Sequence, residues 1–331
     1  MTQAPRVAWM DAGRGLAIIL VVLLHSEEWL AQIGWGSWFW SMANQLLAGM
    51  RMPLFFAISG MLGAGWADRS WRDLLTRKVA FLAWVYLAWQ PVDLAASALS
   101  YQFTHGQQPW HHWPLVFLAR VVFPGSTLWF LWALAVFFVL AKVLHGRSIS
   151  AQIFGSALVA YVVTCDLFPV INVGWNGVAQ YAVFFLVGKL LRDRLERLAN
   201  YVDGAPTVAL AIWFSWLAVA AVVIVAHLQV LPGAGFVVRI LGLAAGITAA
   251  VALAQTGMVC WIGQRTLPVY VAHKAMIIVL VWLLSLVGTP AVVWVWAPPL
   301  LAAQVIAWAI ALHGVRHLWW LYAPPGWATG R

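Results

Sequence analysis

The sequence predicts an all-α protein that crosses a membrane many times as a bundle of helices. Of its 331 residues, 64% are hydrophobic and only 9% are charged. A soluble domain carries about 25% charged residues, so no water-soluble fold could bury this much apolar surface. The apolar runs are continuous and rich in Leu, Ala, Val and Trp, whereas the strands of a membrane barrel alternate apolar and polar residues.

Ten apolar segments are candidates for crossing a bilayer, which takes about 20 residues in a helix. No soluble domain, long linker or low-complexity tract separates them, so the whole chain, 1–331, is expected to form one membrane domain. The last segment contains Pro298-Pro299, and we expect it to start late or to kink there. In chain order the segments are 9–29, 44–66, 79–99, 126–144, 149–168, 175–192, 206–229, 236–256, 266–287 and 292–320.

Basic residues occur in alternate loops between these segments. They occur in 66–78, 144–149, 189–205, 257–265 and the C-terminal tail, whereas 29–43, 100–119, 166–175 and 288–292 have none. Arg120 and Arg239 are the exceptions. Because cytoplasmic loops of membrane proteins are enriched in Lys and Arg, the pattern predicts about ten spans with both termini in the cytoplasm. The net charge of +9 is then a property of the loops and not a sign of nucleic-acid binding.

The first span, within Trp9–Glu28, carries Arg14 and His25 eleven residues apart. Eleven steps of about 100° come within ~20° of three full turns, so both side chains lie on one stripe about 16 Å apart along the axis. Ionisable groups inside a membrane usually face protein or a water-filled cavity and usually serve function. The loop charges place Arg14 at the cytoplasmic end and His25 toward the outer half.

His25 is the candidate general base, and Glu28 is its candidate partner. Glu28 follows three residues later on the same face, where a carboxylate can fix the imidazole tautomer and raise its basicity. The structural alternative is a buried histidine that is merely hydrogen-bonded. Arg14 similarly follows Asp11 by three residues, and it is either an anion-binding group or an arginine that reaches the membrane surface beside an aspartate.

The second span, 44–66, carries Arg51 and Pro53 in its opening part and Ser59-Gly60 further along. We expect Pro53 in an early turn, where proline is tolerated, and the small pair where another helix approaches closely. Arg69 and Arg72 follow this span, three residues apart. They lie on one face if this segment is helical, and they then suit a ligand with phosphates and an adenine ring, although the pattern alone favours ordinary cytoplasmic loop charge.

Several other polar residues have no role that their pattern assigns. The outer segment 101–114 carries His111 and His112 among Trp and Gln, which suits either sugar binding or an aromatic belt at the membrane surface. Adjacent histidines diverge on a helix, and no metal-ligand spacing occurs, so no metal site is expected. His273 attracts attention only because of its depth in the ninth span, and the role of Arg51 is likewise open.

Taken together, five stretches resemble the acyltransferase-3 family of integral-membrane acyltransferases, and in particular its short, fucose-O-acetylase-like type. They cover nearly the whole chain and occur in the family's order. Members of the short type often have His where this chain has Arg51. The stretches are MDAGRGLAIILVVLLH (10–25), RMPLFFAISGMLGAG (51–65), TLWFLWAL (127–134), YAVFFLVGKLL (181–191) and GQRTLPVYVAHKAMI (263–277).

The resemblance implies a ten-span fold and transfer of an acyl group, commonly acetyl from acetyl-CoA, to a sugar hydroxyl. It implies that Arg14 and His25 are needed for activity, and it matches Arg69 and Arg72 to the family's paired arginines. We therefore expect a bacterial inner-membrane O-acyltransferase in which Arg14, Arg69 and Arg72 bind acyl-CoA and His25 with Glu28 activates a hydroxyl of a glycan or glycolipid.

Two alternatives belong to other classes. A transporter or flippase of a lipid-linked sugar could use the same cavity without chemistry, although the chain has no evident internal repeat of the kind common in transporters. A structural or partner-binding membrane subunit is the other alternative, but it has no need of polar groups along one stripe.

Overall fold

The structure is a computed structural model that describes residues 7–105, 112–228, 231–287 and 295–324. Within these residues the regular structure is helical and no strand occurs. The elements are α1 (Ala8–Gln32), α2 (Trp38–Gly63), η1 (Ala64–Trp66), α3 (Trp71–Asp73), η2 (Leu74–Val79), α4 (Ala80–His105), α5 (Trp113–Val122), α6 (Trp129–Val143), α7 (Ile149–Thr164), α8 (Val173–Leu190), α9 (Arg192–Asp203), α10 (Pro206–Val225), α11 (Ala234–Ala252), α12 (Gly257–Gly263), α13 (Thr266–Ser285), α14 (Ala297–His313) and η5 (Arg316–Leu321).

The protein is a polytopic helical membrane bundle, as the composition predicts. In the described part of the chain, six helices are long and apolar enough to cross a membrane: α1, α2 with η1, the continuous α3–η2–α4 helix, α10, α11 and α13. The other four predicted spans fall on shorter helices, α6, α7, α8 and α14, of 15 to 18 residues. The count of ten spans and the cytoplasmic position of both termini stay predictions.

The start of the second span differs from the expectation. Helix α2 begins at Trp38 and not near residue 44, so Pro53 lies inside the helix and not in an early turn. Proline lacks the N–H that would bond to the carbonyl of Gly49. Helix α11 crosses α2 at this carbonyl, where a Cβ on Gly242 would lie 2.3 Å from the Gly49 oxygen. Neighbouring helices commonly support prolines of this kind in membrane proteins.

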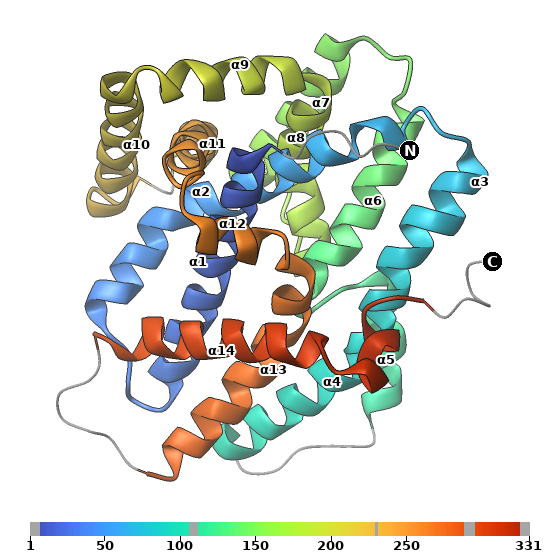
Figure 1. Ribbon diagram of the computed structural model, residues 1–331, viewed down its shortest axis with the longest axis vertical. Helices are drawn as coiled ribbons and strands as arrows, with labels where there is room; N and C mark the ends of the chain where they lie inside the picture. The colour runs from blue at the N-terminus through green and yellow to red at the C-terminus, as the bar shows by residue number, and fades with distance from the viewer. Residues whose placement is uncertain (1–6, 106–111, 229–230, 288–294, 325–331) are drawn as a thin grey trace.

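The last predicted span starts late, as the proline pair indicates. Helix α14 begins at Ala297 with Pro298 and Pro299 in its first turn, where the missing N–H groups cost nothing. Figure 1 shows that α14 runs across α1 and α13 and not alongside them, and it contacts both.

Glycines allow the closest helix crossings of the bundle. A Cβ on Gly60 of α2 would lie 2.0 Å from the Phe185 carbonyl oxygen, and one on Gly188 of α8 would lie 1.9 Å from that of Ala57. The small residues predicted at Ser59-Gly60 therefore do mark a close approach. On the other side of the bundle, a Cβ on Gly263 of α12 would lie 1.8 Å from the Asp11 oxygen of α1.

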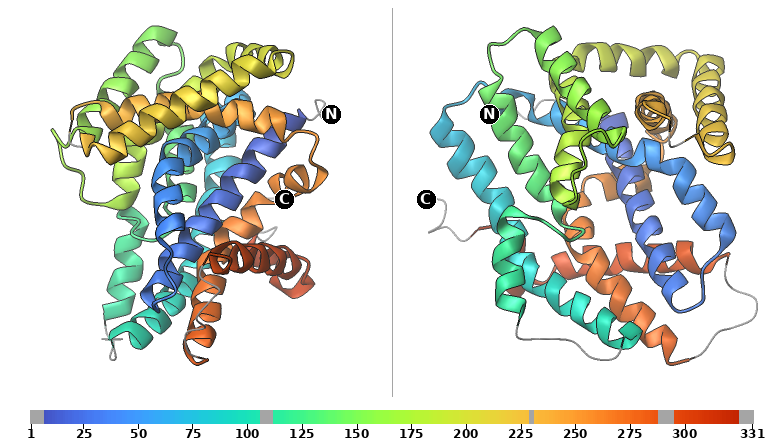
Figure 2. Two further views of the ribbon diagram at one scale, coloured as in Figure 1. Left: turned by 90° about the vertical axis from the view of Figure 1, so that its left-hand side faces the viewer. Right: turned by 180° about the vertical axis from the view of Figure 1, so that it is seen from behind.

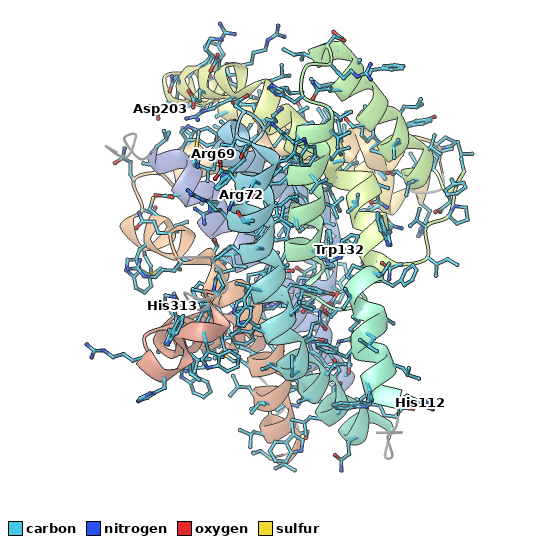
Figure 3. All side chains as sticks on the ribbon, turned by 90° about the vertical axis from the view of Figure 1, so that its right-hand side faces the viewer. Arg69, Arg72, His112, Trp132, Asp203 and His313 are labelled. Carbon is cyan, nitrogen blue, oxygen red and sulfur yellow. The ribbon has the colours of Figure 1, made fainter. Side chains whose placement is uncertain are left out.

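Three of the five basic segments lie at one end of the molecule. Figure 1 places the turns before α3 and between α6 and α7, together with α9, at the upper end, while the α1–α2 turn lies at the opposite end. Figure 2 shows α9, α10 and α11 together at the upper end in both views. In Figure 3, Arg69 and Arg72 lie toward that end and His112 lies at the other. The position of these three segments agrees with the alternation of loop charge along the sequence, whereas α12, which precedes Arg265, and η5, which carries Arg316, lie further from that end.

Candidate active site

Helix α1 presents Arg14 and His25 to the same neighbour, helix α13. The Arg14 guanidinium donates a hydrogen bond to Thr266 Oγ1 at 2.7 Å, and the His25 ring stacks on the His273 ring with centroids 5.3 Å apart. The two α13 residues are seven positions apart, which is close to two helical turns. The single stripe predicted from helix arithmetic is therefore present, and α13 supplies a matching stripe.

Arg14 is held from two sides at its end of the stripe. Asp11 Oδ1 lies 4.0 Å from Arg14 Nη1, which agrees with the predicted spacing of three residues. Gln264 Nε2 donates to the other Asp11 oxygen at 3.0 Å. The carboxylate that balances Arg14 is thus fixed by the turn between α12 and α13, so the guanidinium is oriented before any ligand binds.

A cavity of about 320 Å³ opens beside Arg14. Polar groups on its wall are Arg14, Ser59, Lys78, Thr266 and Tyr270. The remaining lining is apolar and comes from α2, α4, α6 and α13: Phe55, Leu62, Gly63, Phe81, Leu82, Phe130, Leu131, Leu134, Phe138 and Leu267. A pocket with two cations at a mostly apolar wall fits a ligand that joins an anionic part to an apolar arm.

Lys78 is the second cation that lines this cavity, and its backbone is π-helical. It lies in the π-helical turn η2, between α3 and α4. Such turns are rare and are frequent at functional sites. Its ammonium lies 4.8 Å from the ring centroid of Phe138 and 6.0 Å from that of Trp66. No carboxylate lies within ion-pair distance of Lys78 in the described part of the chain.

Arg69 and Arg72 lie beside the cavity and do not line it. The Arg69 guanidinium lies 4.5 Å from the ring centroid of Trp66, the same indole that lies 6.0 Å from the Lys78 ammonium. Ser70 caps α3 by accepting a hydrogen bond from the Asp73 N–H, so Arg69 precedes that helix and does not share a helical face with Arg72. Lys142 of α6 holds the Arg69 turn by donating to the carbonyls of Ala67 and Arg69.

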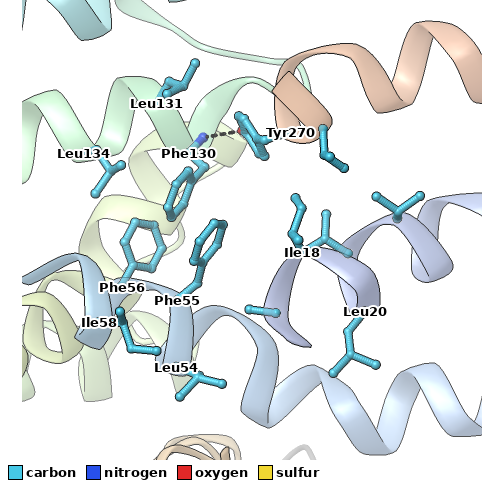
Figure 4. Close-up of a cluster of buried hydrophobic side chains, with 14 of the residues drawn as sticks. Ile18, Leu20, Leu54, Phe55, Phe56, Ile58, Phe130, Leu131, Leu134 and Tyr270 are labelled. Carbon is cyan, nitrogen blue, oxygen red and sulfur yellow. Dashed lines mark hydrogen bonds between the residues drawn. The ribbon is translucent and has the colours of Figure 1, made fainter. Parts of the chain in front are cut away.

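Three aromatic side chains that line the cavity, Phe55, Phe130 and Tyr270, pack against one another. Phe55 and Phe130 stack with centroids 4.5 Å apart and an interplanar angle of 7°, and Phe130 lies 5.3 Å from Tyr270. Figure 4 shows these rings converging between α2, α6 and α13, with the Tyr270 hydroxyl accepting from the Phe130 N–H at 3.0 Å. Tyr270 also donates to the Thr127 carbonyl. Both bonds fix the phenol at the start of α6.

The His25 site lies just beyond this aromatic group. His273 is fully buried, with its ring centroid 5.8 Å from that of Tyr270 and 5.3 Å from that of His25. On its other side, His25 Nδ1 donates to Glu28 Oε2 at 2.8 Å. The predicted His25–Glu28 pair is therefore present. The carboxylate fixes the proton on Nδ1 and leaves Nε2 as the basic nitrogen.

Buried polar groups also surround this end of α1 and α13. Arg51 is 5% exposed, and it donates to the side-chain and backbone oxygens of Asn44. On α13, Lys274 shares the carboxylate of Asp93 with Arg120, at 2.9 and 2.7 Å. This buried ion triad ties α13 to α4 and α5. It also accounts for Arg120, which interrupts the loop-charge pattern.

Sequence reasoning left four groups of the site unassigned. Thr266 and Tyr270 carry no charge and are ordinary in a membrane helix, and Lys78 is one of several basic residues in its loop. His273 differs in that its depth was a signal, but nothing in the sequence links it to His25. The spacing of Thr266, Tyr270 and His273, which is four and then three residues, could have identified a common stripe.

Of the predicted outer-loop histidines, His112 does not join the site. His112 begins the helical region of α5, at the opposite end of the molecule from Arg69 (Figure 3), and His111 lies outside the described residues. Among the residues that the structure describes, no group of three or more His, Cys, Asp or Glu side chains is placed to hold a metal ion.

Comparison with known proteins gives two matches to this chain. The family model described as "Acyltransferase domain", of the acyltransferase-3 type, matches residues 7–314. The chain is also similar to the "Inner membrane protein YcfT" of Escherichia coli (strain K12), with 25% identity over 298 residues that cover 81% of this chain and 79% of the relative. No solved structure gives a significant match.

Proposed function

Because this chain belongs to the acyltransferase-3 family, we propose that it is an O-acyltransferase of a bacterial inner membrane that moves an acetyl group from acetyl-CoA to a hydroxyl of a glycan or glycolipid. One observation carries the proposal. A single stripe of α1 joins a cation-lined cavity at Arg14 to a paired histidine and carboxylate at His25. The inner-membrane relative supports the location.

The donor fits the Arg14 cavity by its chemistry. The phosphates of CoA are anionic, and they suit Arg14 and Lys78 on the cavity wall with Arg69 and Arg72 at the adjoining surface. The pantetheine arm is a thin chain of amides and methylenes, and it suits the apolar lining with its few hydroxyl groups. In this arrangement the thioester points toward the aromatic group of Phe55, Phe130 and Tyr270, behind which His273 and His25 lie.

The acceptor is activated by His25. The proton of the acceptor hydroxyl moves to His25 Nε2, the hydroxyl oxygen forms the new ester bond to the acyl carbon, and the C–S bond of the thioester breaks. The CoA thiolate leaves and takes up the proton that His25 received. The Glu28 carboxylate holds the imidazole in the required tautomer and balances the charge that His25 carries after it takes the proton.

Mass spectrometry of cell-surface glycans tests the function. Cells that lack the protein should lose an O-acetyl modification, and the unaltered gene should restore it. His25→Gln should not restore it, whereas His317→Gln, an exposed histidine in η5, should. A transporter without chemistry predicts that no acetyl group depends on the protein, and full O-acetylation with His25→Gln would contradict the mechanism.

A further inference from the structure

We propose that His273 is a positioning residue that stabilises the positive charge formed on His25 during acyl transfer, by presenting the face of its own ring to it. The proposal rests on the proposed function, in which His25 becomes an imidazolium. It assigns a role to a buried side chain that the mechanism above does not use.

The geometry of the two rings carries the first step. Their centroids are 5.3 Å apart and their planes differ by 27°, so the rings are stacked. A cation within about 6 Å of an aromatic ring face is attracted to it, and the attraction is larger where water is excluded. His273 is 0% exposed, so this face of His25 is dry.

The hydrogen bonding of His273 carries the second step. Its Nδ1 lies 2.6 Å from the Tyr270 carbonyl oxygen, which can only accept, so the proton is on Nδ1. Its Nε2 is buried and has no hydrogen-bond partner among the described residues. No carboxylate lies within ion-pair distance of the ring there either. A fully buried imidazole without an acidic partner is expected to be neutral, so what it offers to His25 is a π face and not a charge.

His25 therefore has two different neighbours, a carboxylate at the edge of its ring and an aromatic ring against its face. Glu28 accepts from Nδ1 at 2.8 Å, and the neutral His273 ring lies against the face. Both contacts are stronger when His25 is positively charged than when it is neutral. That charge exists only after the acceptor proton has moved, so these contacts lower the barrier without tightening the binding of either substrate.

A role for His273 as a nucleophile or base requires its Nε2 to touch a substrate. That atom is buried. The stacking role needs no such access. The two roles also require different features of the side chain. Stacking requires an aromatic ring, whether or not it contains nitrogen, whereas a nucleophile or base requires the ring nitrogen.

Three substitutions, each made in the full-length protein in detergent, test whether the ring or the nitrogen of His273 is required. His273→Phe keeps a ring and removes both nitrogens, His273→Leu removes the ring, and His273→Asn keeps a donor near the Nδ1 position without a ring. We expect kcat to fall about tenfold for the Leu and Asn variants with KM for acetyl-CoA unchanged, since tenfold is 1.36 kcal/mol and cation–π contacts are of this order. We expect His273→Phe to stay within about threefold of the unaltered protein.

The proposal is overturned if His273→Phe loses as much kcat as His273→Leu, or if His273→Asn keeps its activity while His273→Phe does not. Thermal unfolding of each variant shows whether it folds, and the Asn variant replaces the Leu variant if the latter does not fold. His25→Gln keeps the two failures distinct. If His25→Gln is fully active, the proposed function fails and the role of His273 falls with it. If His25→Gln is inactive and the ring makes no difference, only the role of His273 is overturned.

Discussion

At the scale of single residues, the proposed mechanism depends on how two ionisable side chains of α1, Arg14 and His25, are held. Arg14 is held by Asp11 and Thr266, and His25 is held by Glu28 and His273. In each case one partner is three residues away on α1 and the other comes from α13. The near partners can be read from the sequence because three-residue spacing fixes their distance. The far partners cannot, because they depend on how α13 crosses α1.

Glu28 provides a direct test of the His25 site. Glu28→Gln keeps an oxygen that can accept from His25 Nδ1 but removes the negative charge that balances the imidazolium. A hydrogen bond to a charged group is worth about 1 kcal/mol more than one between neutral groups, so we expect kcat to fall about tenfold with little change in KM for acetyl-CoA. Steady-state kinetics measures both quantities. A Glu28→Gln protein with unaltered kcat would show that the carboxylate only caps the end of the helix.

Lys78 and Arg77 form a matched pair for testing the donor site. Lys78 lines the cavity and has no acidic partner among the residues that the structure describes, whereas the adjacent Arg77 is exposed and bonds to Asp73 at 3.2 Å. Removing a cation that meets a phosphate costs about 1.5 to 3 kcal/mol, so Lys78→Met should raise KM for acetyl-CoA at least about tenfold. Arg77→Met should change it less than about twofold. Equal effects of the two substitutions would mean that only the general surface charge matters.

At the scale of elements, the position of Arg14 depends on how tightly α12 packs on α1. Gly263 has no room for a side chain, because its Cβ would lie 1.8 Å from the Asp11 carbonyl oxygen. The same helix contains Gly257, whose Cβ would meet nothing within 4 Å. The sequence shows both as glycines in an apolar stretch, and only the packed structure distinguishes them.

Gly263→Ala should therefore destabilise the protein, and Gly257→Ala should not. Overpacking of this kind costs about 1 to 3 kcal/mol, and separating α12 from α1 would also disturb the Asp11–Arg14 contact. We expect a lower unfolding temperature and a raised KM for acetyl-CoA for Gly263→Ala alone. Thermal unfolding in detergent, with acetyl-transfer kinetics, measures both. If the two variants are equally stable, α12 is not packed on α1 as described.

At the scale of the whole molecule, the sequence predicts much of the fold and less of the site. Hydropathy identifies the helices because a chain in lipid must satisfy its backbone hydrogen bonds within each segment. It misplaces the start of α2, which begins at Trp38 with Pro53 in its interior, and it does not show that α11 crosses α2 closely at Gly49. It also does not foresee that α14 lies across α1. The cavity combines side chains from α1, α2, η2, α4, α6 and α13, so no local pattern describes it.

Cysteine labelling tests the predicted direction of the bundle. Cys165 and Cys260 are free cysteines, and both would first be replaced by serine. A cysteine at Ser37, before α2, should then react with a membrane-impermeant maleimide in intact cells. A cysteine at Ser148, before α7, should react only after the cells are opened. Labelling of Ser148→Cys in intact cells would reverse the orientation and place Arg14 on the outside.

The central claim is that the acyl donor enters at the Arg14 end of α1 and the acceptor is modified at the His25 end. Labelled acetyl-CoA supplied to sealed membrane vesicles of either orientation tests this claim most directly. Inside-out vesicles expose the cytoplasmic face, and they should transfer label to the glycan or glycolipid fraction with the unaltered protein and not with His25→Gln. Right-side-out vesicles should transfer none, because CoA does not cross the bilayer. Label transfer in right-side-out vesicles, or undiminished transfer by His25→Gln, would contradict the account.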